Sequence, residues 1–357
     1  MSVFDGLPQA MFDVIPELKT FAPTREPRST CSHCANACAP EDLPKKPYRF
    51  HPDIRCCTYH PALPNWAVGR AIRGGGLAEQ KIRERIAHHR TGVKVYGLSA
   101  YKEWSPRKRF PDEMAFGRRE ELLCPYYVGG EQACGIYLYR DASCRTFHCK
   151  TDDGPRGQEY WLNLRSVIRA GGLLMAHRCV EELTAPEEDA PVEAMIDWYL
   201  RCAERIEHMT EEDRESIRDN EEMRSLVEEV VKSQTALKPP LPERLGASIK
   251  HVDFTPDFIE LTGEELFDTI RAPTSIFQFI GRLDGNKPWK EVLAFANTLI
   301  GDAEPISEAF VENLYRWGIL RAISGPESLA VSRRARIRNP DGSVQPVTLE
   351  QLLSEEE

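Results

Sequence analysis

Cys124-Pro125-Tyr126-Tyr127 begins a stretch, CPYYVGGEQACGIYLYRDASCRTFHC, that ends at Cys149 and contains two further cysteines, Cys134 and Cys144. Proline, glycine and aromatic residues lie between the four cysteines, and no long apolar run separates them. A thiolate is a soft, strong metal ligand, and four converging thiolates suit zinc or an iron–sulfur cluster. We therefore expect the N-terminal half of the chain to fold around metal.

A second group of cysteines lies upstream. Cys31, Cys34 and Cys38 follow one another with two and three residues between them. This spacing lets neighbouring sulfurs converge on one metal from a tight turn. A further ligand must come from elsewhere, and the adjacent Cys56 and Cys57 are a ready source. Because neighbouring side chains point apart in extended backbone, we expect one of this pair to bind metal.

These nine cysteines suffice for two sites of four thiolates each. One site would hold Cys31, Cys34 and Cys38 with one cysteine of the pair at 56–57, and the other would hold the four cysteines of 124–149. Two such sites fit two 4Fe–4S clusters or two structural zinc ions, since four cysteines satisfy either metal. Alternatively, all of these cysteines share one larger centre.

Other candidate ligands have weaker claims. Cys179 and Cys202 stand in helical surroundings and are interpreted as buried apolar residues. A lone histidine is more often solvated or a capping residue than a ligand, although imidazole is a common zinc ligand. Three histidines are therefore treated as secondary candidate metal ligands: His33, His51 and His60.

Two arginines, Arg140 and Arg145, flank the second cysteine group. A guanidinium near several thiolates would stabilise their negative charge and lower the pKa values of the thiols. The alternative is a surface salt bridge with Asp141 or Glu131.

The composition is that of a soluble globular protein. The chain has 357 residues, enough for two domains, with 41% hydrophobic and 29% charged residues. No apolar run reaches the length of a membrane-spanning helix, and the N-terminus lacks the basic start and apolar core of a signal peptide. We expect a cytoplasmic protein that does not enter a membrane. A reducing cytosol favours metal binding by cysteines over disulfides.

Charge is distributed unevenly along the chain. Residues 1–180 hold 27 Lys and Arg against 19 Asp and Glu, whereas residues 181–357 hold 19 against 37, so the net charges are +8 and −18. Net charge gives information about association rather than about the fold. We favour two domains whose opposite charges help them to dock, and the alternative is a basic face for an anionic partner.

The cysteine pattern resembles that of a known family. Cys-Pro-Tyr-Tyr at 124–127, Cys-x-Ile-Tyr-x-x-Arg at 134–140 and Cys-Arg-x-Phe-x-Cys at 144–149 look like the cysteine-cluster family of zinc- or iron-chelating proteins (YkgJ-like, CxxCxxCC type). Flagellin lysine methylases carry a looser, related pattern. The resemblance covers roughly residues 31–150 and implies that the four cysteines of 124–149 and the upstream group bind metal. The chain departs from the family where its Cys-Cys pair is displaced to 56–57, away from Cys38.

The remaining sequence predicts a mainly α fold. Apolar residues at helical spacing predict helices at 77–89, 159–182, 192–209, 211–237, 275–283, 289–299 and 306–317. The acidic stretch 183–192 contains two prolines and is the best candidate for a domain boundary. The expected order is an irregular, metal-organised, cysteine-rich domain at 1–182, a helical linker region at 192–245 and a small α+β module at 250–347.

The C-terminal module resembles small winged-helix domains, including the PqqD-like peptide-binding kind. The similarity lies in the turn Leu283-Asp284-Gly285-Asn286 and in the sequence LYRWGIL at 314–320. It implies a protein or peptide partner. The helix that would have to read DNA, 307–316, is acidic, so we do not expect nucleic acid to bind. A turn at 339–342 predicts a hairpin between 333–338 and 343–347.

No Ser-His-Asp order, paired-carboxylate signature or nucleotide fingerprint stands out. The leading hypothesis is an iron–sulfur protein that acts in electron transfer or in modification of a protein or peptide partner. The alternative is a protein-interaction module whose zinc is structural. The resemblance to flagellin lysine methylases implies a third hypothesis, a protein lysine methyltransferase.

Overall fold

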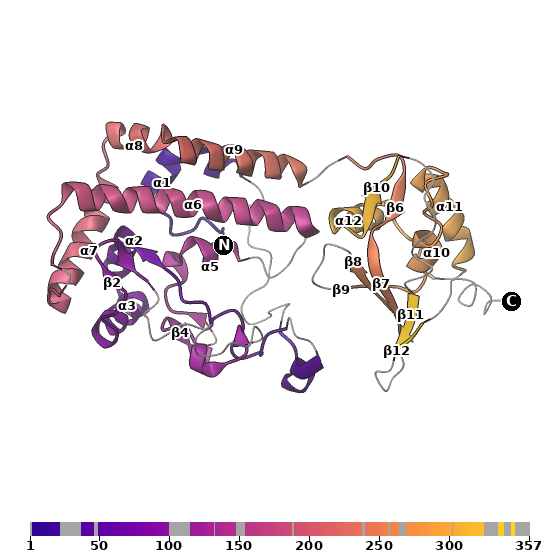
Figure 1. Ribbon diagram of the computed structural model, residues 1–357, viewed down its shortest axis with the longest axis horizontal. Coiled ribbons are helices and arrows are strands. Elements are labelled where there is room, and N and C mark those ends of the chain that lie inside the picture. The colour runs from indigo at the N-terminus through magenta and orange to yellow at the C-terminus, as the bar shows by residue number, and fades with distance from the viewer. Residues whose placement is uncertain are drawn as a thin grey trace. The chain divides into compact units, whose positions relative to one another are not determined.

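The structure is a computed structural model. It describes residues 2–21, 37–45, 49–99, 115–131, 133–147, 154–187, 189–237, 240–255, 258–263, 269–301, 303–324, 335–338 and 344–346. Helices account for 53% of the structure and strands for 13%, so the fold is mainly α, as the sequence predicts. The chain divides into two compact units (Figure 1). Unit 1 comprises Met1–Lys150 and Tyr160–Gln234, and unit 2 comprises Thr151–Glu159 and Thr235–Glu357.

This division differs from the expected one. The stretch 183–192 lies inside unit 1, and most of the expected linker region at 192–245 belongs to unit 1 as well. Prolines and acidic residues at 183–192 mark a connection between two helices of one unit rather than a domain boundary. The reason is that the helix after this connection packs against the cysteine-rich part of the chain.

Unit 1 is built mainly of helices. They are α1 (Gln9–Val14), α2 (Asn65–Arg73), α3 (Gly76–His88), α5 (Ala142–Thr146), α6 (Gly154–Glu182), α7 (Val192–Glu207), α8 (Glu211–Arg218) and α9 (Glu221–Ala236). The first residues of α6 and the last residues of α9 belong to unit 2. Among the described residues, no helix is long and apolar enough to span a bilayer.

The close packing of α2 against α7 organises unit 1. A Cβ atom on Gly69 would lie 1.8 Å from the backbone oxygen of Tyr199, so only glycine allows the two backbones to approach this closely. From the same helix, Trp198 Nε1 donates to the carbonyl of Val95 and Tyr199 Oη donates to that of Lys94, each at 2.8 Å. Helix α7 therefore also holds the short hairpin that follows α3.

The strands of unit 1 are short. They form a three-stranded antiparallel sheet in the order β1-β3-β2 and a separate hairpin. The strands are β1 (Leu63–Pro64), β2 (Val93–Lys94), β3 (Gly97–Leu98), β4 (Tyr127–Val128) and β5 (Ala133–Cys134). These two-residue strands carry little core of their own, so side chains of the helices must supply most of the buried apolar surface.

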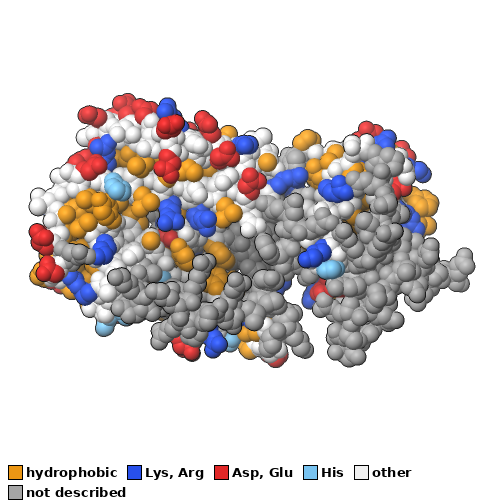
Figure 2. Space-filling view, viewed as in Figure 1, with side chains coloured by type: hydrophobic (Ala, Val, Ile, Leu, Met, Phe, Trp, Pro, Cys, Tyr) orange, Lys and Arg blue, Asp and Glu red, His pale blue; other side chains and the backbone are white. Residues whose placement is uncertain are grey.

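The helix expected at 211–237 is two helices, α8 and α9. Helix α8 begins with a capping box between Thr210 and Asp213. A second cap lies nine residues downstream of Glu211, where Asn220 Oδ1 accepts the backbone N–H of Met223 at 3.1 Å. Because a capping side chain satisfies backbone donors at a helix start, Asn220 begins a new helix. Figure 2 shows acidic side chains gathered over α8 and α9.

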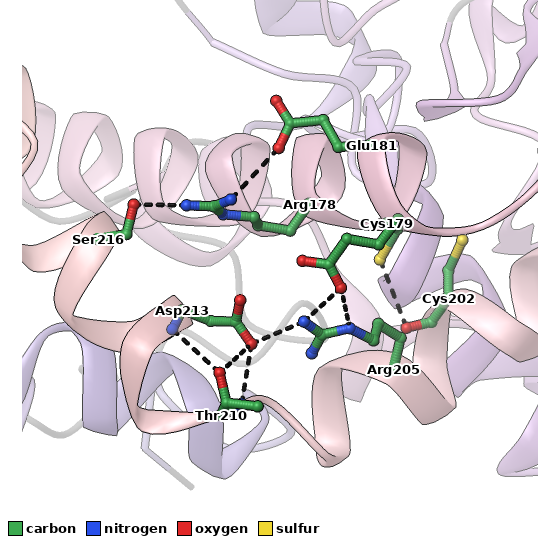
Figure 3. A network of polar contacts seen from close by, with 9 residues as sticks. Arg178, Cys179, Glu181, Cys202, Arg205, Thr210, Asp213 and Ser216 are labelled. Atoms are coloured by element: carbon green, nitrogen blue, oxygen red, sulfur yellow. Dashed lines mark hydrogen bonds and ion pairs between the residues drawn. The ribbon is translucent and has the colours of Figure 1, made fainter.

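A polar network ties α6, α7 and α8 together (Figure 3). Arg205 Nη2 lies 2.5 Å from a carboxylate oxygen of Glu182 and 2.6 Å from one of Asp213. Burial by itself would raise the pKa of Asp213, but hydrogen bonds from Arg205 and Thr210 outweigh it and hold this pKa at about 2. Asp213 is thus a charged, largely enclosed partner of Arg205 at neutral pH.

The described part of unit 2 contains a mixed sheet, a strand pair and three complete helices. The five-stranded sheet has the order β12-β11-β7-β8-β9, in which β11 and β7 are parallel and the other neighbouring strands are antiparallel. Separately, β10 pairs with β6 in an antiparallel manner. The strands are β6 (Leu245–Ala247), β7 (Ile249–Phe254), β8 (Ile259–Gly263), β9 (Thr269–Ala272), β10 (Leu320–Ala322), β11 (Ala335–Arg338) and β12 (Val344–Pro346). The helices are α10 (Ile276–Ile280), α11 (Trp289–Leu299) and α12 (Glu308–Arg316).

The core of unit 2 joins its sheet to its helices. Val252 and Leu261 come from neighbouring strands, and Phe279, Ala296 and Leu314 come one from each helix, all fully buried. The three helices and the β11–β12 hairpin confirm the sequence prediction. Within the stretch 254–261, β7 ends and the antiparallel β8 begins.

Candidate metal centre

The hairpin of β4 and β5 positions two of the predicted ligands. Tyr127 pairs with Cys134 across the hairpin, so Cys134 lies beside the segment that begins at Cys124. The backbone N–H of Cys124 donates to the carbonyl of Cys57 at 2.7 Å. This bond fixes the hairpin against the upstream Cys56-Cys57 pair, although 66 residues separate Cys57 from Cys124 by number.

The short helix α5 positions a third predicted ligand, Cys144. Asp141 caps this helix, and its Oδ1 atom accepts the backbone N–H of Cys144 at 2.8 Å. Beside it, Tyr59 Oη donates to Ser143 Oγ at 3.1 Å. Because Tyr59 follows the Cys56-Cys57 pair by two residues, this bond joins α5 to the same upstream segment.

The thiols carried by these segments influence one another electrostatically. Burial raises the pKa of Cys124, and negative charge on Cys134, Asp141 and Cys56 raises it further. Burial likewise raises the pKa of Cys144 well above its usual value, with further increases from Asp141, Cys124 and Cys134. Four thiols from three segments of the chain are therefore coupled: Cys124 interacts with Cys56 and Cys134, and Cys144 interacts with Cys124 and Cys134.

This set of thiols has the chemistry of a soft metal site. Neutral thiols are weak ligands, and four desolvated thiolates would repel one another strongly without a compensating cation. A bound cation reverses this balance, because it deprotonates its coordinating thiols outright. The residues therefore fit zinc or an iron–sulfur cluster in donor type and number. Across the described part of the chain, no three His, Cys, Asp or Glu side chains already stand in metal-binding geometry.

Among the described cysteines, Cys56 of the upstream pair interacts electrostatically with Cys124, and Cys144 does so with Cys124 and Cys134. Cys149, the expected fourth member, lies outside the described residues, as do Cys31 and Cys34.

Cys38 is tied to a cluster of phenylalanines. Its backbone N–H donates to the carbonyl of Phe50 at 3.1 Å. The ring of Phe50 in turn lies 5.5 Å from that of Phe116 and 6.5 Å from that of Phe147, between ring centroids. These contacts place Cys38 in unit 1 beside the end of the 124–149 stretch.

The remaining cysteines and histidines are engaged in other ways. Cys179 and Cys202 are fully buried, as expected, and Cys179 Sγ lies 3.6 Å from the carbonyl oxygen of Cys202 (Figure 3). Burial lowers the pKa of His60 to about 4, and its Nε2 atom lies 3.1 Å from the Leu123 carbonyl. His51 Nδ1 accepts the backbone N–H of Asp53. His33 lies outside the described residues.

Arg145 anchors the N-terminal residues through backbone carbonyls. Its buried guanidinium donates to the backbone carbonyls of Val3 at 3.1 Å and Asp5 at 2.6 Å, and also to that of Leu138. These bonds fasten the N-terminal residues to the segment before α5. The pKa values of Cys124 and Cys144 are raised, so the expectation of lowered thiol pKa values is wrong for these two residues.

The sequence did not point to Tyr59, Ser143 or Asp141 as neighbours of the thiols. Serine and tyrosine are common on protein surfaces, and no spacing distinguishes these two from others. Asp141 had a usable signal, since an aspartate three residues before Cys144 and ahead of a short helix is a typical capping position.

Comparison with known proteins adds no family to this description. No protein-family model matches the chain, and no curated protein or solved structure matches it. The resemblances described from the sequence therefore stay predictions.

Proposed function

We propose that unit 1 is a metal-binding cysteine-cluster module and that its metal is iron in an iron–sulfur cluster. The observation that supports this most is the electrostatic coupling of Cys124 with Cys56, Cys134 and Cys144, together with the backbone bond from Cys124 to Cys57 and the hairpin pairing of Cys134 with Tyr127. Four thiolates are the full ligand set of one 4Fe–4S cluster. The upstream cysteines leave room for a second cluster of the same kind.

A structural zinc ion is the second candidate, since four thiolates also satisfy zinc. The feature that favours it is the irregular scaffold around the thiols, in which two-residue strands and a five-residue helix supply few backbone hydrogen bonds. Small scaffolds of this kind commonly depend on metal for their folding energy.

We also propose that unit 2 recognises a protein or peptide segment rather than nucleic acid. Three helices followed by strand β10, paired with β6, support a winged-helix-like arrangement. Helix α12 carries Glu308 and Glu312, and Lys290 on α11 pairs with Glu308 at 2.9 Å. An acidic helix repels the phosphate backbone of DNA, whereas it suits a basic or neutral peptide. In this proposal, unit 1 transfers electrons to, or modifies, the partner that unit 2 binds.

Anaerobic purification followed by elemental analysis and visible spectroscopy tests the proposal. An iron–sulfur protein is coloured and bleaches on reduction with dithionite. Colourless protein with one or two equivalents of zinc supports the second candidate. Protein that contains neither metal after anaerobic expression in iron- and zinc-supplemented medium contradicts both.

Four variants locate the site. Cys124→Ser and Cys56→Ser should each lower the metal content by at least one site and destabilise unit 1, because metal-binding energy is folding energy. Cys202→Ala is the matched control, since this buried cysteine contacts Cys179 rather than the four cysteines of the candidate metal centre. Full metal in Cys56→Ser but not in Cys57→Ser would show that the quartet was assigned to the wrong member of the pair.

A further inference from the structure

A cavity of about 310 Å³ lies in unit 1. Two of its lining residues also belong to the surroundings of the thiols. Tyr59 follows Cys57 by two residues, and Asp141 accepts the backbone N–H of Cys144. The cavity and the candidate metal centre therefore share part of a wall.

Most of the cavity wall is apolar. It includes Met11, Leu63, Trp66, Leu98, Ile168 and Leu173, which come from α1, β1, α2, β3 and α6. The indole N–H of Trp66 donates to the carbonyl of Gly172 at 2.9 Å, so the ring presents carbon to the space. Pockets for small organic molecules have this character and volumes of roughly 300–1,000 Å³. At roughly 30 Å³ per water-sized group, the space holds about ten non-hydrogen atoms.

The charged groups around the cavity are almost all cations. One carboxylate, Asp141, faces five cations: Arg70, Lys94, Arg140, Arg145 and Arg169. Two of the guanidinium groups are held in place by backbone carbonyls, Arg145 by those of Val3 and Asp5 and Arg70 by that of Gly6. Carbonyls fix the position of a guanidinium without cancelling its charge. The interior therefore attracts an anion.

Arg169 is the cation best placed to pair with such an anion. It lies exposed on α6, and no hydrogen bond or ion pair joins it to another residue that the structure describes. Its charge acts on Tyr59, which also lines the cavity. Figure 2 shows Lys and Arg side chains among hydrophobic ones on the face of unit 1 near α6.

We propose that this cavity binds a small organic carboxylate with an apolar body, whose carboxylate pairs with Arg169 while the apolar wall covers the rest. A guanidinium offers two parallel N–H groups that match the two oxygens of a carboxylate. Because none of the four thiols lines the cavity, this site is a separate claim from the metal site. It places an organic anion beside Tyr59 and Asp141, which also lie in the surroundings of the candidate metal centre.

Isothermal titration calorimetry on the full-length protein as purified tests the proposal. The probes are hexanoate, 4-phenylbutyrate and indole-3-propionate, each compared with its uncharged primary amide. At least one carboxylate should bind with a dissociation constant of roughly millimolar or below, as expected for about ten atoms, and about tenfold more tightly than its amide. If no carboxylate binds more tightly than its amide, the proposal is overturned.

Three variants locate the binding. Arg169→Gln should weaken carboxylate binding about tenfold and leave amide binding unchanged. Arg165→Gln removes the same charge from the same helix at a position that does not line the cavity, and it should bind as wild type does. Ala62→Trp fills the space from an exposed lining position and should abolish binding of both probes. Wild-type affinity in both Arg169→Gln and Ala62→Trp would place any binding elsewhere. Metal content should be the same in all three variants, which separates this result from the metal proposal.

Discussion

Replacing Gly69 by alanine should destabilise unit 1, although alanine is the better helix former. Alanine in place of glycine gains roughly 1 kcal/mol of helix propensity. The new Cβ atom, however, would lie 1.8 Å from the backbone oxygen of Tyr199 and 2.9 Å from the Cβ atom of Ala203. Real Cβ atoms essentially never come closer than 3.0 Å to such neighbours, so α7 would have to retreat from α2 by about 1.2 Å.

The retreat of α7 has consequences beyond the contact itself. Trp198 would be drawn away from the carbonyl of Val95, and Tyr199 from that of Lys94. Each of these hydrogen bonds now measures 2.8 Å. Overpacking of this kind costs about 1–3 kcal/mol, and each lost hydrogen bond adds about 1 kcal/mol. After the gain in propensity is subtracted, we expect a net loss of about 3 kcal/mol in the free energy of unfolding.

Gly172→Ala is the matched control for this prediction. Gly172 also lies in a helix, but its new Cβ atom would lie 3.5 Å from the Trp66 ring, an ordinary van der Waals contact. This variant should be as stable as wild type or more stable by up to about 1 kcal/mol. Urea denaturation followed by circular dichroism measures both variants. If Gly69→Ala unfolds at the same urea concentration as wild type or at a higher one, the close approach of α2 and α7 is refuted.

Two further changes test the polar contacts of unit 1. Asp213→Asn should cost about 1–2 kcal/mol at neutral pH by weakening the bond to Arg205. The pKa of Asp213 is about 2 in the folded protein and 3.8 in its usual state. Its contribution to the free energy of unfolding is therefore full above pH 3.8 and is lost as the pH falls through 2. Wild type and variant should converge in stability over that window. Arg145→Met should cost about 3 kcal/mol, because it removes several charge-assisted bonds to backbone carbonyls at once. Hydrogen exchange at Val3 and Asp5 should then accelerate, and unchanged protection there would contradict the anchoring role.

Local patterns predicted many of the elements. The helices at 76–88, 192–207 and 289–299 have apolar residues at helical spacing, and such spacing depends only on the turn of the chain itself. The turn residues at 339–342 likewise predicted the β11–β12 hairpin. Where a local cue was overlooked, the prediction was wrong, as at Asn220, whose side chain caps a new helix within the stretch expected to be continuous.

The sequence by itself determined that this is a mainly α chain in which nine of eleven cysteines gather in the first 150 residues, because composition and periodicity are properties of neighbours along the chain. Only the tertiary structure decided that the Cys56-Cys57 segment lies against Cys124, and that α7 belongs with the cysteine-bearing segments. Such pairings depend on which surfaces fit against each other. Cys124 forms a backbone hydrogen bond with Cys57, and Gly69 allows the backbone of Tyr199 to approach closely. No rule of sequence spacing relates the residues in either contact.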